Sequence, residues 1–349
     1  MAELINISCK KNKEKLTKRL SRIVQSANIN FLIGSGCSYP AINVSGDTEK
    51  RIMEARTNGK DDIAEEILHD FLIQFLDNTK LLLENDTRKI KNTLEVYKMF
   101  LNNISNLLFN RKSNIIPSQA IVFSTNYDLF LEYAMNDFNN NFILCDGFKR
   151  TSNITGEYYY SSTEYFNTIF NTGNLYRYKV EIPTINLIKL HGSLNWQKKG
   201  DKIIQDLSYI NKADKIKNSK NIVDIRNFNL LFNIVLPQDN KLRLTILEEI
   251  YYDLLRIYSN ELDKENTILI VEGFSFADQH ILEITRRALK NKTFNLIVFC
   301  FNNDDLSLLS SIFHSYRNVY IISNSRDNID FKQFNKILSE IINVEEDES

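Results

Sequence analysis

The four cysteines of this 349-residue chain stand far apart, and no two of them form a C-x-x-C pair. They are Cys9, Cys37, Cys145 and Cys300. A structural zinc site needs closely spaced thiolate or imidazole ligands, and a disulfide framework needs cysteines in a dense, pairable set. The pattern argues against both, and we expect no bound metal.

The chain also lacks long apolar runs and an excess of charge of either sign. No stretch approaches the roughly 18 apolar residues of a membrane helix, and the N-terminus has no apolar signal core. We therefore expect a cytoplasmic protein without membrane contact. Acidic and basic residues number 44 and 43, so no overall field favours direct binding of nucleic acid. The basic residues between 10 and 19 are interrupted by Glu14, which indicates a solvated helix face.

Proline is scarce, with four residues, and no Gly/Ser-rich linker or repeat divides the chain. Hydrophobic residues make up 43% and charged residues 25%, the ordinary balance of a globular protein. We therefore expect a single domain over residues 1–349, with insertions.

Six short apolar runs end in small or polar residues, which is typical of buried strands. They are "NINFLIGSG", "QAIVFSTN", "TINLIKLHG", "NTILIVEGFS", "FNLIVFCFNN" and "NVYIISN". Helical patterns follow several of them. Such alternation predicts an α/β fold with a Rossmann-like, doubly wound parallel sheet, and ligands of such sheets bind at the carboxyl ends of the strands.

The Rossmann-like core is expected over about residues 20–45, 115–149 and 184–349, with a helical insertion at 46–114 and a less regular one at 150–183. The less regular insertion could be a flap over the ligand edge or a surface excursion. Ile63, Ile67, Phe71 and Phe75 recur every four residues, as on one helix face. We expect this stripe to pack on the sheet or a neighbouring helix, with a partner-binding face as the alternative.

Two of the strand ends carry residues suited to nucleotide chemistry. In "LIGSGCS", glycines let backbone N–H groups approach a phosphate, although a pair of turn glycines explains the motif equally well. The third glycine and downstream acid of the ordinary dinucleotide fingerprint are missing. In "LIKLHGSLNW", His191 stands at a strand end before a glycine, where it could accept a proton or be purely structural.

The stretch "STNYD", residues 124–128, places four polar residues where a helix cap needs one. A site is one explanation, and ordinary caps or Asx-turns are the other. In "VEGFSFADQH", Ser275 and Asp278 have the spacing of a capping-box variant. Gly273 and Asn302, in "VFCFNNDD", could make room for a ribose and hydrogen-bond to it.

Taken in order, these five stretches resemble the sirtuin-like (silent-information-regulator-like) family, in particular its NAD-hydrolysing branch of bacterial antiphage defence proteins. The resemblance runs from about residue 28 to 305 and rests on "GSGCS", "STNYD", "KLHGS", "GFSFAD" and "FNN". It implies that NAD is bound as a substrate.

The resemblance assigns catalytic roles to three residues. Asn126 would hold the attacking water or the nicotinamide ribose, Asp128 would lie near the nicotinamide pocket, and His191 would act as the base. The cofactor-binding residues that it implies are Gly34, Ser35 and Gly36 at the pyrophosphate, Thr125 at the ribose, and Gly273, Ser275 and Asn302 at the adenosine. Thr125 stands where sirtuins carry Gln, so the ribose contacts differ in detail.

The function that this resemblance favours is NAD glycohydrolase, which releases ADP-ribose and nicotinamide and depletes NAD in defence. The four-cysteine zinc module of sirtuin deacylases has no counterpart, which disfavours a protein deacylase. Two further functions stay open, a non-enzymatic sensor of NAD or ADP-ribose and an ADP-ribosyltransferase. Nicotinamide leaves as a neutral base, so the chemistry needs an oriented water and a stabilised oxocarbenium-like state rather than a strong acid.

The family also suggests partners. No sensor domain is recognisable in the chain, and we expect a homo-oligomer and a HerA-type hexameric ATPase encoded nearby. We place the helical insertion, residues 46–114, outside the NAD edge and expect it to carry subunit contacts.

Overall fold

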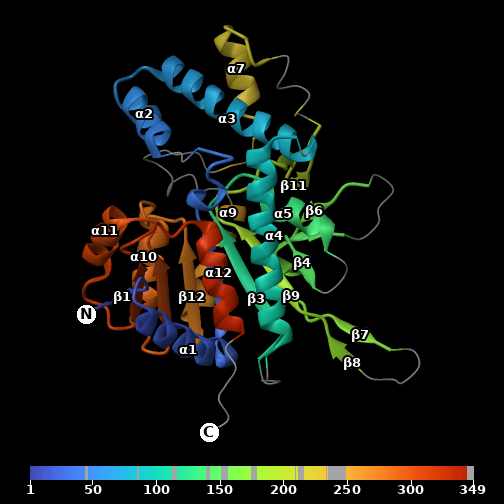
Figure 1. The fold of residues 1–349 in the computed structure, drawn as a ribbon. Coiled ribbons are helices and arrows are strands. Elements are labelled where there is room, and N and C mark those ends of the chain that lie inside the picture. The colour runs from blue at the N-terminus through green and yellow to red at the C-terminus, as the bar shows by residue number, and fades with distance from the viewer. Residues whose placement is uncertain are drawn as a thin grey trace.

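An eight-stranded parallel sheet forms the centre of the molecule (Figure 1). The computed structural model describes residues 1–43, 46–84, 86–111, 116–138, 142–150, 156–173, 179–208, 210, 216–232, 234 and 249–343. Across the sheet the strands are β1 (Glu3–Asn6), β14 (Val319–Ser323), β13 (Asn295–Phe299), β12 (Thr267–Glu272), β2 (Asn28–Ile33), β3 (Gln119–Ser124), β9 (Thr184–Lys189) and β4 (Ile143–Cys145). The predicted α/β, Rossmann-like sheet is confirmed.

All six predicted strands form, because runs that are apolar throughout suit a sheet buried on both faces. Every residue of β9 and β12 is buried, as are five of the six residues of β2 and of β3. The edge strands β1 and β4 have no fully buried residue, and their short, mixed sequences gave no strand signal.

Helices cover both faces of the sheet and enclose two hydrophobic cores. On one face lie α1 (Lys10–Ser26), α4 (Arg88–Phe109) and α12 (Phe331–Ile342). On the other lie α9 (Glu249–Asp263), α10 (Gln279–Ala288) and α11 (Asn303–Phe313). The two faces share the strands, whose side chains alternate between the cores: Phe31 of β2 enters the first and Leu32 the second.

Three helices occupy the chain between β2 and β3: α2 (Gly46–Thr57), α3 (Asp61–Glu84) and α4. In Figure 1, α2 and α3 lie beyond the carboxyl ends of the strands, with α7 (Ile222–Asn229) packed on α3. On the predicted stripe of α3, Phe71 and Phe75 are buried and meet the ring of Tyr127 edge to face, whereas Ile63 is 46% exposed. The stripe therefore packs toward the ligand edge of the sheet.

Smaller elements flank β9. An antiparallel sheet contains β10 (Trp196–Lys199), β11 (Lys202–Gln205), β6 (Tyr159–Tyr160) and β5 (Phe148–Lys149), and a hairpin pairs β7 (Phe170–Thr172) with β8 (Lys179–Glu181). Short helical turns are η1 (Ser35–Ser38), α5 (Phe130–Ala134), η2 (Met135–Asp137) and η3 (Ser162–Glu164). Parts of the predicted insertion 150–183 lie outside the described residues.

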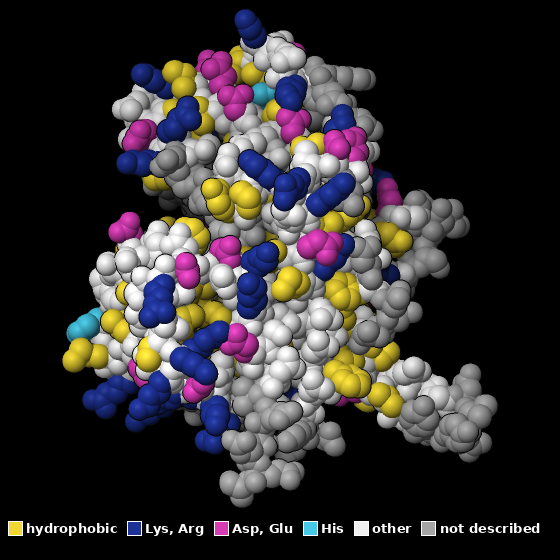
Figure 2. Space-filling model, in the orientation of Figure 1, with side chains coloured by type: hydrophobic (Ala, Val, Ile, Leu, Met, Phe, Trp, Pro, Cys, Tyr) yellow, Lys and Arg dark blue, Asp and Glu magenta, His cyan; other side chains and the backbone are white. Residues whose placement is uncertain are grey.

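The surface carries both charges, as the balanced composition predicts (Figure 2). The basic residues of the N-terminal segment lie on α1, where Lys10, Lys11, Lys15 and Lys18 are exposed, in agreement with a solvated helix face. Within the described residues, no helix combines the length and the apolar character needed to cross a membrane.

Candidate functional site

A cavity of about 730 Å³ opens at the carboxyl ends of five neighbouring strands, β13, β12, β2, β3 and β9. From β2 the chain proceeds to β3 and β9 on one side, whereas β12, β13 and β14 lie on the other. The strand order therefore reverses between β2 and β12. Doubly wound sheets bind their ligands at this kind of switch point.

The loops after β2 and β12 touch through their glycines at the floor of the cavity. A Cβ on Gly34 would lie 2.2 Å from the carbonyl oxygen of Gly273, and one on Gly36 would lie 2.8 Å from the Gly273 Cα. Gly273 itself has φ +65°, a conformation that favours glycine. The amides of Gly34 and Gly36 donate to the carbonyls of Glu272 and Gly273, both at 3.0 Å. These glycines thus join the two halves of the sheet, and a phosphate would have to meet other N–H groups of the loop.

Asn126 is held in one orientation by its amide nitrogen. Nδ2 donates to the Gly34 carbonyl at 3.0 Å and lies 3.3 Å from Ser38 Oγ and 3.4 Å from the Tyr97 hydroxyl. Asn126 Oδ1 is buried and has no hydrogen-bond partner among the described residues. A buried carbonyl oxygen without a donor is costly, so the site offers an acceptor to a hydroxyl group or a water in the cavity.

A chain of two hydrogen bonds runs from the Tyr97 hydroxyl of α4 through Ser38 to the carboxylate of Asp128. Ser38 Oγ donates to Asp128 Oδ2 at 2.7 Å, which uses its only proton. The Tyr97 hydroxyl, 2.8 Å from Ser38 Oγ, must therefore be the donor in that contact. Burial, and then the negative charge of Asp128, raises the pKa of Tyr97 well above its ordinary value, which keeps this proton in place.

The buried side chain of Lys189 binds the backbone of the stretch 124–128. Lys189 Nζ, at the end of β9, donates to the carbonyl oxygens of Asn126, at 3.0 Å, and Asp128. It also pairs with Glu132 Oε1 at 3.4 Å. Burial raises the pKa of Glu132, whereas the charge of Lys189 lowers it. Sequence reasoning missed this lysine, because its position inside an apolar run gave no indication of a role.

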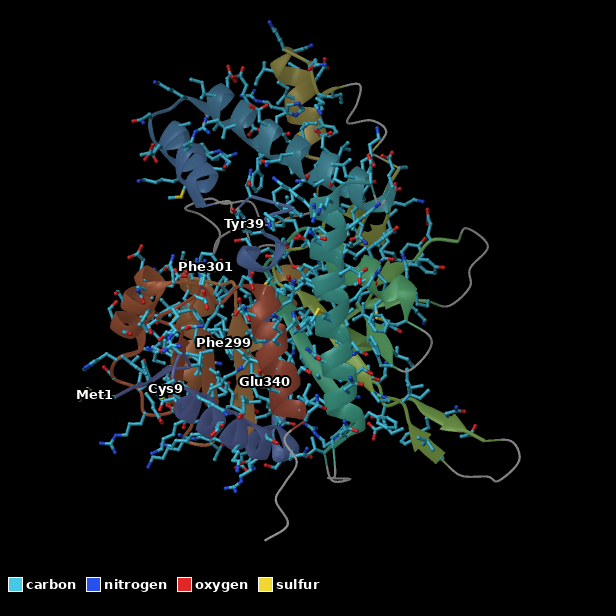
Figure 3. The ribbon with its side chains drawn as sticks, viewed as in Figure 1. Met1, Cys9, Tyr39, Phe299, Phe301 and Glu340 are labelled. Atoms are coloured by element: carbon cyan, nitrogen blue, oxygen red, sulfur yellow. The ribbon has the colours of Figure 1, made fainter. Side chains whose placement is uncertain are left out.

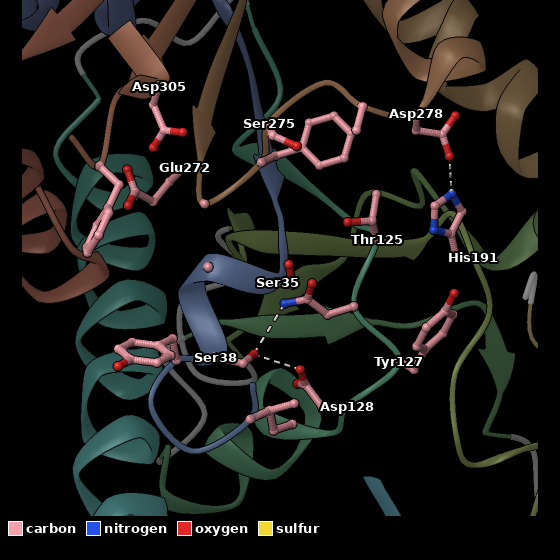
Figure 4. Close-up of a pocket in the computed structure, with 18 of the residues that line it drawn as sticks. Ser35, Ser38, Thr125, Tyr127, Asp128, His191, Glu272, Ser275, Asp278 and Asp305 are labelled. Carbon is pink, nitrogen blue, oxygen red and sulfur yellow. Dashed lines mark hydrogen bonds and ion pairs between the residues drawn. The ribbon is translucent and has the colours of Figure 1, made fainter. Parts of the chain in front are cut away.

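His191 faces an acid from the opposite half of the sheet. Its Nε2 lies 3.0 Å from Asp278 Oδ2, and its other ring nitrogen points toward the side of the cavity where Thr125 lies (Figure 4). A carboxylate beside Nε2 favours a proton on that nitrogen and leaves Nδ1 as the acceptor. Asp278 also caps α10, with Oδ1 accepting from the amide of His280 at 3.0 Å.

The capping residue of α10 is thus Asp278 itself, so the predicted capping-box role of Ser275 is wrong. Ser275 is exposed and lines the cavity. Asn302 also lines it and caps α11, with Oδ1 accepting from the amide of Asp305 at 3.0 Å. Its amide nitrogen is then the group left to meet a ribose hydroxyl.

Acids gather at the end of the cavity opposite His191. Glu272, at the end of β12, is 4% exposed, and its Oε2 has no hydrogen-bond partner among the described residues. Burial raises its pKa well above the ordinary value, and the charges of Asp330 and Asp305 raise it further. The aromatic residues Tyr39 and Phe301 lie at the same edge, 57% and 42% exposed (Figure 3).

The cavity brings together nine of the ten predicted site residues. They are Ser35, Gly36, Thr125, Asn126, Asp128, His191, Gly273, Ser275 and Asn302. Gly34 lies directly behind them, against Gly273. The sequence reasoning did not assign four residues to the site, namely Ser38, Tyr97, Glu272 and Asp278. Ser38, Glu272 and Asp278 lie inside or beside the quoted motifs, which was a local signal, whereas Tyr97 lies far from all of them in the sequence.

The helical insertion also reaches the cavity. Met53 of α2 and Phe75 of α3 line it, and Tyr97 of α4 contacts Asn126. The expectation that residues 46–114 lie outside this edge is wrong, because α2 and α3 fold across the carboxyl ends of the strands rather than along the face of the sheet.

A family model described as "SIR2-like domain" matches residues 120–322, more than half of the chain. The chain belongs to the SIR2-like family. The matched span carries Asn126, Asp128 and His191 as well as the loops after β12 and β13, whereas the glycine loop after β2 precedes it. Membership confirms the sirtuin-like resemblance and supports an activity related to NAD.

A search of the curated proteins finds no match. Among the described residues, no group of three or more His, Cys, Asp or Glu side chains could hold a metal ion. The four cysteines are all free, with Cys37 and Cys300 buried.

Proposed function

We propose that the protein is an NAD glycohydrolase, which cleaves NAD and water into ADP-ribose and nicotinamide. The observation that carries the proposal is the buried, unpartnered Asn126 Oδ1 in the same cavity as His191. An acceptor that orients a hydroxyl or a water, together with a proton acceptor, is what hydrolysis of an N-glycosidic bond requires.

In the proposed reaction, the bond between the ribose C1′ and the nicotinamide nitrogen breaks, and its electron pair neutralises the pyridinium. Water adds to C1′, and the proton it loses passes to His191 Nδ1 and then to solvent. Asp278, 3.0 Å from Nε2, stabilises the imidazolium that forms. Asn126 Oδ1 accepts a hydrogen bond from the water or from a ribose hydroxyl and holds the reacting atoms in place.

Incubation of the purified protein with NAD, with and without an acylated peptide, separates this proposal from the competing functions. Release of nicotinamide and ADP-ribose without peptide supports the glycohydrolase. Turnover that requires the peptide indicates a deacylase or an ADP-ribosyltransferase. Saturable binding without turnover indicates a nucleotide sensor and contradicts the hydrolase.

For the biological role, we propose NAD depletion in antiphage defence, on the basis of the resemblance to that branch of the family. An unregulated NAD hydrolase would exhaust the NAD of its own host, so the enzyme must be controlled. We propose that control comes from homo-oligomerisation and from a HerA-type ATPase encoded nearby, acting on the elements over the cavity.

A further inference from the structure

The outer face of α1 carries a concentration of positive charge. Seven of the 17 residues of this helix are Lys or Arg, and only Glu14 is acidic. In Figure 2, Lys and Arg side chains gather over this helix. The whole chain has 43 basic and 44 acidic residues, so its nearly neutral total conceals one strongly basic helix.

Four of these side chains are exposed and lie four, three and four residues apart, which is the spacing of one helix face: Lys11, Lys15, Lys18 and Arg22. We call these four residues the basic row. With a rise of about 1.5 Å per residue, the row is about 16 Å long. Glu14 interrupts the bases in the sequence, but in the helix it lies beside the row and pairs with Lys10 at 3.8 Å. The row itself is therefore continuous.

The rest of α1 fixes the helix to the protein. Arg19 pairs with Glu3 of β1 at 2.9 Å, and Lys13 pairs with Glu340 of α12 at 2.6 Å. The apolar side of the helix is buried in the core, at Leu16, Leu20 and Val24. The basic row thus stands on a firmly packed helix, so its four charges keep a defined spacing.

We propose that the basic row binds the phosphate backbone of duplex nucleic acid without reading the bases. One strand of a duplex presents a phosphate about every 3.4 Å along the axis, which gives about five phosphates beside a row of this length. Four cations on one helix face complement such a series of anions. None of the described residues that line the cavity lies on α1, so this surface is separate from the site of the proposed function.

The composition of this face favours a phosphate backbone over a protein partner. Protein interfaces are built around aromatic and apolar anchors and are depleted in Lys. Among the described residues, none of the exposed large hydrophobic side chains lies on α1 or on the neighbouring α12. Unpaired bases would need aromatic side chains on which to stack. The row therefore fits a duplex that is recognised by its charge.

The dependence of binding on salt tests the inference without requiring NAD turnover. Fluorescence anisotropy with a labelled DNA duplex should show the logarithm of the binding constant falling with the logarithm of the salt concentration, with a slope of about −4. Lys15→Gln/Lys18→Gln should reduce the slope to about −2 and weaken binding roughly tenfold or more at low salt, for every duplex sequence. Lys11→Gln/Arg22→Gln should reproduce this loss, so the test does not depend on the folding of one variant.

The matched control is Lys198→Gln/Lys202→Gln, which removes the same charge from exposed positions on β10 and β11, away from α1 (Figure 1). This variant should bind DNA like the wild type. Absence of DNA binding by the wild type, or an unchanged slope in both row variants, overturns the inference. Tighter binding of polyglutamate or of single-stranded DNA than of the duplex also overturns it, because the row would then fit an acidic polypeptide or unpaired bases.

Discussion

Asn126 depends for its orientation on residues from two other elements. Ser38, in η1, and Tyr97, in α4, lie within 3.4 Å of its amide nitrogen, and Gly34 accepts from it. Because Nδ2 already has hydrogen-bond partners, Oδ1 is the atom left to accept a hydrogen bond from the proposed ligand. Preorganisation of this kind lowers the barrier by fixing the reacting groups before the reaction begins.

Removal of the Tyr97 hydroxyl should impair catalysis more than binding. Tyr97→Phe keeps the ring that stacks on Phe130 at 5.3 Å, but removes the donor to Ser38. We expect kcat for NAD cleavage to fall roughly tenfold and the affinity for ADP-ribose to stay within about twofold, since the loss is one of alignment. Steady-state kinetics and calorimetry measure the two quantities.

The control for this change is Tyr133→Phe, whose hydroxyl lies on the surface and contacts only the Leu83 carbonyl at 3.4 Å among the described residues. Its kinetics should match the wild type. An equal fall in kcat and in ADP-ribose affinity for Tyr97→Phe would show that the residue has a general structural role.

Glu272 makes the stability of the fold depend on pH. Its pKa is raised above the ordinary 4.5, so the folded state holds a proton that the unfolded chain has lost in the range between the two values. Stability is therefore complete below about pH 4 and falls as the pH rises through the raised value. Glu272→Gln has no carboxyl group to ionise, so its stability should not fall in this way as the pH rises. It should be more stable than the wild type near pH 8, with a smaller difference at low pH.

Thermal unfolding across this pH range measures the effect, and Glu265→Gln, at an exposed position, provides the comparison. A stability difference between wild type and Glu272→Gln that does not change with pH would mean that the Glu272 carboxyl is ionised alike in the folded and unfolded states.

At the scale of elements, the ends of β3 and β9 are joined through Lys189. The lysine side chain is 3% exposed and binds two carbonyls of the 124–128 stretch as well as Glu132. This arrangement links β9, whose following loop carries His191, to the stretch that carries Asn126. The relative position of the two proposed catalytic groups thus depends on the buried contacts of Lys189.

Lys189→Met should therefore destabilise the protein by roughly 3–5 kcal/mol, because it leaves Glu132 as a buried charge without its partner. Adding Glu132→Leu should recover part of this loss. Chemical denaturation measures both variants, with Lys198→Met as the exposed control. If Lys189→Met alone is as stable as the wild type, the lysine does not stabilise the fold by pairing with Glu132.

Much at this scale could be predicted from the sequence. The central strands are apolar throughout, and a parallel sheet buried on both faces requires such runs. Their polar ends placed Asn126 and His191 at one edge. The pairing of His191 with Asp278, by contrast, joins residues from opposite halves of the sheet, and no local pattern encodes it. In the sequence, Tyr97 fits the apolar stripe of a helix. Helical periodicity predicts that its ring is buried but does not predict that its hydroxyl contacts Ser38 and Asn126.

At the scale of the whole molecule, α2 and α3 lie beyond the carboxyl ends of the strands and contribute to the cavity lining. Met53 and Phe75 come from α2 and α3, so a partner that shifts these helices would reshape the site. Regulation through this layer needs no contact with the catalytic residues themselves.

Assembly is the corresponding prediction. We expect light scattering to show a multimer, and NAD turnover to change when the proposed partner, a HerA-type ATPase encoded nearby, is added. A protein that is strictly monomeric and indifferent to that partner would exclude control by assembly, without affecting the proposed chemistry.

The most direct measurement of the central claim is NAD cleavage by Asn126→Ala and His191→Ala beside the wild type, alone and with the proposed HerA-type partner. The wild type should release nicotinamide and ADP-ribose in equal amounts, and each variant should lose roughly a hundredfold or more of the rate while remaining folded. His314→Ala, at an exposed histidine that is not among the residues lining the cavity, should retain full activity. Wild-type turnover in both cavity variants would contradict the assignment of the site.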